Sequence, residues 1–199
     1  MGIKAILFDL DGVLIDTVEC WVRAFNDTYR KYGQREISKD EFIREYWGHS
    51  SEKGFKHLGS DALSYCNARQ IDNLWMAKPI PGAREVLELC SKKVKLGLVT
   101  NTPKKNTLKE LEMFGLKEYF DVVVTGDDVR NKKPSPDMVI EACERLGVSV
   151  DDVVMVGDTE SDLLAGKSAG CRVIGVNVHA DWMVKDMSEL KLLLLEMLK

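Results

Sequence analysis

The chain has 199 residues and a formal charge of −4, with 28 Lys and Arg residues against 32 Asp and Glu. This length fits one domain of ordinary size, or a domain that carries a small insert, and a hydrophobic share of 45% is enough to build a core. The mild acidity excludes the basic face that nucleic-acid recognition requires, so we expect no nucleic-acid partner.

The cysteines and the terminal segments predict a cytoplasmic protein with no membrane partner. Five cysteines occur, widely spaced and with no CxxC pair, which is typical of reduced thiols rather than a disulfide framework or a zinc site. Charge interrupts the N-terminal apolar stretch too early for a signal peptide. The apolar segment 190–199 is far too short to span a bilayer, and we expect it to form a closing amphipathic helix.

In chain order, short apolar and β-branched runs alternate with helical patterns. Such runs suit strands that are buried on both faces of a parallel sheet. One helical pattern, 135–147, places Ser135 as its cap, Pro136 at the first helical position and Gly147 after its end. The alternation predicts an α/β fold with a doubly wound, Rossmann-like parallel sheet. The predicted strands lie within residues 4–11, 94–102, 120–128, 152–162 and 172–178.

Residues 17–79 interrupt this alternation, because they hold helical patterns and no convincing strand. A crossover between parallel strands needs far fewer residues. We therefore predict a small α-helical cap domain at 17–79, inserted into an α/β core that is formed by 1–16 and 80–199. Trp21, Trp47 and Trp75 are expected to fill the core of this insert, although one of them could line a substrate cavity.

Polar side chains follow the carboxyl ends of the predicted strands, which is where ligands bind in open α/β sheets. So many converging carboxylates would be unfavourable without a cation, and magnesium prefers oxygen ligands while leaving room for a phosphate oxygen. We therefore expect Mg²⁺ as cofactor. The side chains at these ends are Asp9, Asp11 and Gly12, then Thr100 and Asn101, then Lys133, and finally Asp158 and Asp162.

The two aspartates of the first strand suggest phosphoryl transfer. Asp9 is ionised at neutral pH and could attack phosphorus directly. Asp11 projects on the same side and could protonate the leaving oxygen, then take a proton from the attacking water. Gly12 allows a tight turn and a close backbone approach, and Thr100 with neighbouring backbone amides could bind phosphoryl oxygens. Lys133 could offset charge on phosphate and carboxylates.

This set resembles the haloacid dehalogenase superfamily, in its phosphatase branch. "DLDGVLIDT" matches the opening DxDGxxxDS/T motif, "VTNT" the run that ends in Thr or Ser, "KPSP" the motif lysine, and "GDTESD" the acidic GDxxxD motif. All four occur in the family's order and cover the core outside residues 17–79. The insert resembles the helical cap of the phosphoglycolate phosphatase-like and β-phosphoglucomutase-like members.

The resemblance implies a role for each matching residue. Asp9 resembles the nucleophile and a metal ligand, and Asp11 the acid/base, whose backbone carbonyl is also a metal ligand. Asp158 matches the direct magnesium ligand, and Asp162 the acid that holds a metal-bound water or the lysine. Lys133 is preferred over Lys132 because the family's lysine directly precedes the proline.

The remaining site assignments concern the phosphate and the cap. Gly12, Thr100, Asn101 and Lys133 are expected to contact the phosphate. In similar capped proteins a loop at the place of residues 47–55 reaches the active site and selects the substrate. Ser50 is our candidate from that loop, and a plain surface turn is the alternative.

The expected function is hydrolysis of a small phosphorylated metabolite, phosphoglycolate-like or a sugar phosphate, through a phosphoaspartyl intermediate. A β-phosphoglucomutase-like phosphomutase would use the same core residues. Dehalogenases and phosphonoacetaldehyde hydrolases fit poorly, since both lack an acid/base aspartate where Asp11 stands. A non-enzymatic phospho-receiver module is a more distant alternative. The oligomeric state is left open.

Overall fold

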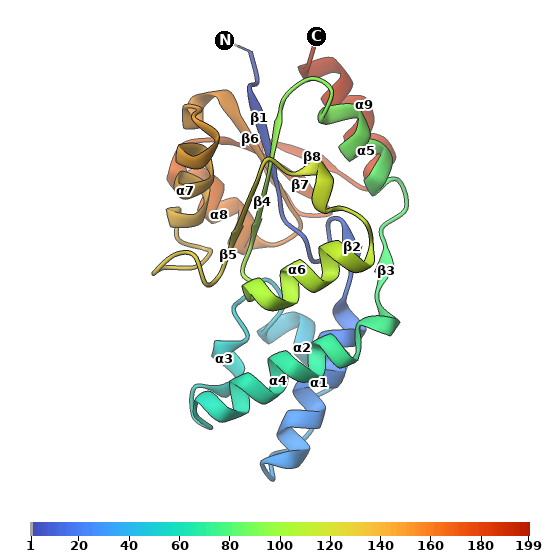
Figure 1. Cartoon of the computed structure of the whole chain (residues 1–199), viewed down its shortest axis with the longest axis vertical. Coiled ribbons are helices and arrows are strands. Elements are labelled where there is room, and N and C mark those ends of the chain that lie inside the picture. The colour runs from blue at the N-terminus through green and yellow to red at the C-terminus, as the bar shows by residue number, and fades with distance from the viewer. Residues whose placement is uncertain (1) are drawn as a thin grey trace.

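A parallel sheet lies between two layers of helices, and a helical bundle sits at one end of it (Figure 1). The computed structural model describes residues 2–199. All pairs in the main sheet are parallel, and chain order reverses on either side of the central strand, which confirms the predicted doubly wound α/β fold. The strands, in spatial order, are β5 (Val122–Thr125), β4 (Lys95–Thr100), β1 (Ala5–Phe8), β6 (Val153–Gly157), β7 (Arg172–Val176) and β8 (Trp182–Val184).

The strands are buried on both faces because their side chains enter two separate hydrophobic clusters. Ile6 and Phe8 of β1 join one cluster, while Ala5 and Leu7 join the other, as the two-residue period of a strand requires. Helices α5 and α9 cover the first face, and α7 and α8 cover the second (Figure 1). The core helices are α5 (Ala83–Cys90), α6 (Lys104–Met113), α7 (Asp137–Leu146), α8 (Glu160–Ala169) and α9 (Met187–Met197).

Two details of the core differ from the prediction. The edge strand β8 was not predicted, because its three residues are too few to show a strand period. Helix α7 begins one residue later than expected: Pro136 is its N-cap, and the Ser135 hydroxyl donates to the Asp137 carboxylate. Gly147 ends that helix in the left-handed conformation, as predicted.

The inserted segment forms a helical bundle with its own hydrophobic cluster. Phe25 is central, with its ring centroid 4.7 Å from that of Phe55 and 5.0 Å from that of Phe42. Trp75 lies outside this cluster and is 69% exposed, so the expectation that it fills the core was wrong. The helices are α1 (Val18–Lys31), α2 (Lys39–Glu45), α3 (Glu52–Phe55) and α4 (Ser60–Asp72).

The chain enters and leaves the helical bundle through a short antiparallel ribbon. It consists of β2 (Ile15–Asp16) and β3 (Lys78–Pro79), in which Ile15 pairs with Pro79. Two strands held together in this way place both connections side by side, so the bundle can pivot over the core about one point. The remaining short helical turns lie at Leu74–Met76, Lys117–Tyr119 and Val150–Asp152. Within residues 2–199, every helix is too short or too polar to cross a membrane.

A buried polar network joins the bundle to the core where α4 packs on α6. The Gln70 side-chain amide donates to the Glu110 carboxylate at 2.6 Å, and the Asn106 amide donates to Gln70 Oε1 at 2.6 Å. Glu110 is fully buried, and its second oxygen, Oε2, has no hydrogen-bond partner. Burial raises the pKa of Glu110 well above its ordinary range, and the nearby charge of Asp11 adds to that shift.

We predict that Glu110→Gln stabilises the protein at alkaline pH. The folded state holds the Glu110 proton more tightly than the unfolded chain, because the pKa of Glu110 is raised by folding. The stability that the protonated side chain contributes is therefore lost as the pH rises from the ordinary glutamate pKa toward the folded pKa. Glutamine has the shape of the protonated carboxyl and does not titrate. Thermal unfolding should therefore show a gain in Tm at about pH 8 that is larger than the gain at about pH 5.

Glu112→Gln is the matched control, because Glu112 lies on the same helix but is exposed and its pKa is lowered by a hydrogen bond from Lys109. Glu112→Gln should give no gain in Tm at alkaline pH. If Glu110→Gln changed the Tm equally at both pH values, Glu110 would not be a buried carboxyl with a raised pKa.

Candidate active site

Asp9 is placed where β1 ends, at the middle of the sheet. Its backbone N–H donates to the carbonyl of Val156 at 2.9 Å, which extends the pairing of β1 with β6 by one residue. The chain then turns sharply: Gly12 has φ of +82°, and its N–H donates to the Ile15 carbonyl at 2.8 Å. Chain order reverses on either side of β1, so this is the point at which open α/β sheets bind ligands.

Lys133 is the charged centre of the site. Its ammonium donates to Asp162 Oδ1 at 2.6 Å and to the Val99 carbonyl at 2.8 Å, and it lies 2.9 Å from Asp9 Oδ1. Burial alone would lower the pKa of Lys133, but the charges of Asp162 and Asp9 outweigh it and raise that pKa. Lys133 therefore stays protonated and links two strand ends. Lys132 instead pairs with Glu52 on the surface.

Asp9, Asp158 and Asp162 form an acidic cluster that fits a divalent cation. One carboxylate oxygen from each lies within 4.8 Å of the others. Asp158 Oδ1 is buried without a hydrogen-bond partner, whereas Asp9 Oδ1 pairs with the Lys133 ammonium at 2.9 Å. An orphaned buried carboxylate oxygen is unfavourable, and a cation that prefers oxygen ligands would satisfy it.

Burial and neighbouring charge raise the pKa values of Asp9 and Asp158. Burial, and then the charge of Asp162, raises the pKa of Asp9 well above its ordinary value, and Lys133 opposes that shift. Burial and Asp162 raise the pKa of Asp158 to about 7, while a hydrogen bond from Trp47 opposes it. A bound cation would reverse this effect, since it favours the ionised carboxylates.

Asp11 is held in a different environment from Asp9. The hydroxyl of Thr102 donates to its Oδ2 at 2.7 Å, and the hydroxyl of Thr17 and the indole N–H of Trp21 donate to Oδ1. Burial raises the pKa of Asp11, and these hydrogen bonds oppose the shift. A raised pKa suits a carboxyl that must donate a proton and then recover it.

The loop between α2 and α3 closes over the site. Trp47 Nε1 donates to Asp158 Oδ2 at 3.0 Å, and the carbonyl of Gly48 accepts from Asn101 Nδ2 at 3.1 Å. Gly12 and Gly48 permit this approach: a Cβ on Gly12 would lie 2.2 Å from Asp158 Oδ2, and one on Gly48 would lie 2.7 Å from Thr159. The helical bundle therefore touches the acidic cluster directly.

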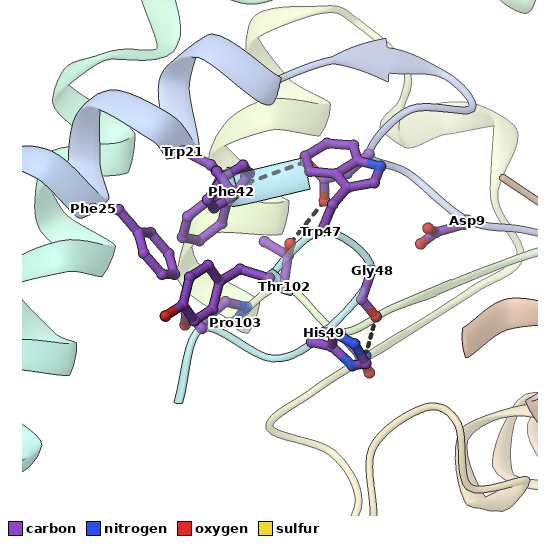
Figure 2. A pocket seen from close by; sticks show the side chains of 13 residues that line it. Asp9, Trp21, Phe25, Phe42, Trp47, Gly48, His49, Thr102 and Pro103 are labelled. Atoms are coloured by element: carbon purple, nitrogen blue, oxygen red, sulfur yellow. Dashed lines mark hydrogen bonds between the residues drawn. The ribbon is translucent and has the colours of Figure 1, made fainter. Parts of the chain in front are cut away.

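A narrow cavity, in which the centre of a water molecule can occupy about 40 Å³, lies between the bundle and the core. Figure 2 places Trp21, Phe25 and Phe42 on one side and Asp9 on the other. Asp11 also lines it, so both candidate catalytic carboxylates face one space. A phosphate ester held there would have its phosphorus near Asp9 and its leaving group among the aromatic rings.

Most of the predicted residues come together, with some differences of detail. Thr100 is buried, and its hydroxyl accepts from the Thr102 N–H at 3.2 Å. Asn101 holds the Lys133 segment, since its side-chain oxygen accepts from the Lys133 N–H at 2.9 Å. Ser50 is not part of the cavity lining; it accepts from Lys132 instead, and Ser51 lines the cavity.

Nothing in the sequence singled out Glu110, which is buried and close enough to Asp11 for the two charges to interact. Thr102 stands at the same strand end as Thr100, but its role of holding Asp11 was not predicted. The tryptophans were expected to form the core of the bundle, with one of them as a candidate for the substrate cavity. Trp21 and Trp47 both line the cavity, and Trp47 also donates to Asp158.

The family model for haloacid dehalogenase-like hydrolases matches residues 6–176. The chain belongs to that family. The match covers all four motifs and the inserted helices, and it makes the protein an enzyme, so the receiver-module alternative is excluded.

Relatives of this hydrolase share most of their length with it. A pyrophosphatase PpaX from Halalkalibacterium halodurans is 33% identical over 193 residues, which are 93% of this chain and 89% of the relative. A phosphorylated carbohydrates phosphatase from Thermotoga maritima is 35% identical over 189 residues, 89% of this chain and 86% of the relative.

Among solved structures, CbbY from Rhodobacter sphaeroides in complex with phosphate superimposes with a TM-score of 0.85 and 26% identity, covering 94% of this chain and 96% of that one. Together these likenesses identify the hydrolase as a phosphatase of small phosphorylated molecules, in the branch with phosphoglycolate phosphatases and β-phosphoglucomutases. The family implies a divalent metal, and the acidic cluster is a candidate site for it.

We predict that Gly12→Ala removes the response to metal. The new Cβ would displace Asp158 and be strained by the φ of +82°. Magnesium should raise the Tm of the unaltered protein, because a ligand that binds only the folded state stabilises it, and should leave the Tm of the variant unchanged.

Gly33→Ala is the matched control for backbone strain. Its φ is +67°, but no atom lies within 4 Å of the added Cβ. It should lose about 1 kcal/mol of stability and keep the full metal response. A normal metal response in Gly12→Ala would show that Asp158 does not bind the ion.

Proposed function

We propose that the protein is a magnesium-dependent phosphatase that hydrolyses a small phosphate monoester through a phosphoaspartyl intermediate on Asp9. The observation that carries the proposal is the acidic cluster around Lys133, in which Asp158 keeps an orphaned oxygen close to Asp9, and Asp9 and Asp11 line one cavity. The proposed nucleophile, the proposed acid and a candidate cation site therefore lie together.

In the first step, an oxygen of the Asp9 carboxylate attacks phosphorus while the bond from phosphorus to the leaving oxygen breaks. Asp11 donates its proton to that oxygen, so the leaving group departs as a neutral alcohol. The raised pKa of Asp11, caused mainly by burial, supports its being protonated before this step. Thr17 and Thr102 hold the carboxyl in place.

In the second step, water attacks the acyl phosphate. Asp11, now ionised, takes a proton from this water, the bond from phosphorus to Asp9 breaks, and phosphate leaves. At the end of the second step Asp9 is again a free carboxylate and Asp11 is again protonated, so the enzyme is ready for the next substrate. Lys133 stabilises the charge of Asp9 and of the phosphoryl oxygens throughout.

The proposed ligands of the ion are the Asp9 and Asp158 carboxylates and the Asp11 backbone carbonyl, with Asp162 holding Lys133 and an ion-bound water. When bound, Mg²⁺ supplies positive charge that favours the ionised form of Asp9 and offsets the phosphate. Gly12, Thr100, Asn101 and Lys133 are the proposed phosphate contacts. Ser50 is a weaker candidate, since Lys132 already donates to it.

The proposed cap domain is 17–79, and the catalytic core is 1–16 with 80–199. The ribbon of β2 and β3 is the natural hinge between them. Closure of the cap would exclude bulk water from the first step and complete the cavity. The expected cytoplasmic location stays a prediction; the five cysteines are free and buried.

The chain's relatives are named for different substrates, pyrophosphate and phosphorylated carbohydrates among them. Phosphoglycolate, pyrophosphate and sugar phosphates are therefore the substrates to test first. A phosphomutase would use the same residues and return the phosphoryl group to a sugar. Release of inorganic phosphate in proportion to substrate consumed supports the phosphatase, whereas isomerised sugar phosphate without free phosphate supports the mutase.

We predict that Asp9→Asn lowers phosphate release by on the order of 10³-fold or more, because the amide is not a nucleophile. The measurement is phosphate release from a generic monoester with magnesium. Asp61→Asn, at the exposed start of α4, is the matched control and should keep full activity. An Asp9→Asn variant as active as the control would overturn the proposed mechanism.

A further inference from the structure

The cavity beside Asp9 has an apolar side formed by aromatic rings from the helical bundle. Figure 2 shows Trp21, Phe25 and Phe42 close together, across the cavity from Asp9. Tyr46 and Trp47 also line the cavity, and Figure 2 shows Trp47 between that group and Asp9. Trp21, Phe25 and Phe42 are at most 6% exposed, so the part of a substrate beyond the phosphorus atom would meet a narrow apolar surface there.

The same cavity has no free positive charge among the described residues that line it. No lysine or arginine lines it, and burial lowers the pKa of His49, with the charge of Lys53 adding to the effect. Lys133 pairs with Asp9 and Asp162, and Lys132 pairs with Glu52, whereas Lys53 lies near His49 but outside the cavity lining. The charges that do line the cavity are the carboxylates of Asp9 and Asp11.

An anionic leaving group would therefore be buried without a partner. A carboxylate or second phosphate placed beyond the phosphorus atom would lose its water and face aromatic rings, whose faces are electronegative. An aromatic ring loses little by the same transfer, because its π surface packs on the indole and phenyl rings. A sugar ring can pack its C–H face in the same way, and its uncharged hydroxyls cost less to remove from water than a carboxylate.

We propose that this cavity selects monoesters of uncharged alcohols that present an apolar face, and rejects esters whose leaving group carries a carboxylate or a second phosphate. The inference rests on the proposed phosphatase function and narrows its substrate class. It predicts that phosphoglycolate and pyrophosphate, although natural candidates from the family, are poor substrates of this chain.

The first test compares substrates that differ by one charge. Phenyl phosphate is paired with para-carboxyphenyl phosphate, and glucose 1-phosphate with glucuronic acid 1-phosphate, which keeps the sugar ring. In each pair we expect kcat/KM for the uncharged member to be higher by about 100-fold, since the site has no group to pair with the added carboxylate. The first pair tests an aromatic alcohol and the second a sugar. The pair with the higher kcat/KM for its uncharged member therefore shows which kind of alcohol the cavity prefers.

The second test adds the missing charge. His49→Arg and Ser51→Arg each place a guanidinium at a residue that lines the cavity, and His49→Gln is the matched neutral control. Each arginine variant should lower the preference for the uncharged member by about tenfold or more, while His49→Gln keeps it. The ratio of kcat/KM within one variant is independent of how much of that variant folds.

The outcomes separate this inference from the proposed function. Phosphate release with equal or better use of the charged members overturns the inference and leaves the phosphatase intact. A preference that neither arginine variant changes also overturns it, because charge would then not be the cause. No release from any ester rejects the proposed function and the inference together.

Discussion

The site depends on one electrostatic constraint: four aspartates converge near a single lysine. Asp9 and Asp162 are buried against Lys133, and the half-buried Asp11 and Asp158 lie beside them. Lys133 compensates only part of this charge. Removing carboxylates from water is unfavourable, so the fold maintains the cluster through hydrogen bonds from Thr102, Thr159 and other donors. A divalent cation at the candidate site would complete the compensation.

The same constraint links the bundle to the chemistry. Trp47 uses Asp158 as its hydrogen-bond acceptor, and Gly48 accepts from Asn101, whose side chain also holds Lys133. Some of the contacts between the bundle and the core are therefore made by the active-site residues themselves, in addition to the network of Gln70, Asn106 and Glu110.

The sequence predicted those features that local chemistry determines. Apolar β-branched runs gave the central strands, and the strand-end motifs gave the acidic cluster and Lys133. Ser38 caps α2 by accepting from the N–H of Glu41, while the Glu41 carboxylate pairs with Arg35. The short edge strand β8 and the ribbon of β2 and β3 were missed, because two or three residues have no period to read. The roles of Trp47 and Glu110 depend on tertiary contacts between segments far apart in the chain, which no local pattern encodes.

The most direct measurement of the central claim is chemical trapping of the phosphorylated carboxyl. Borohydride, added during turnover with magnesium, reduces an acyl phosphate to the alcohol and releases phosphate, so a phosphorylated aspartate becomes homoserine. Peptide mass spectrometry should then find homoserine at Asp9 and leave Asp11, Asp158 and Asp162 unchanged. Homoserine at another of these positions, or none during rapid phosphate release, would contradict the account.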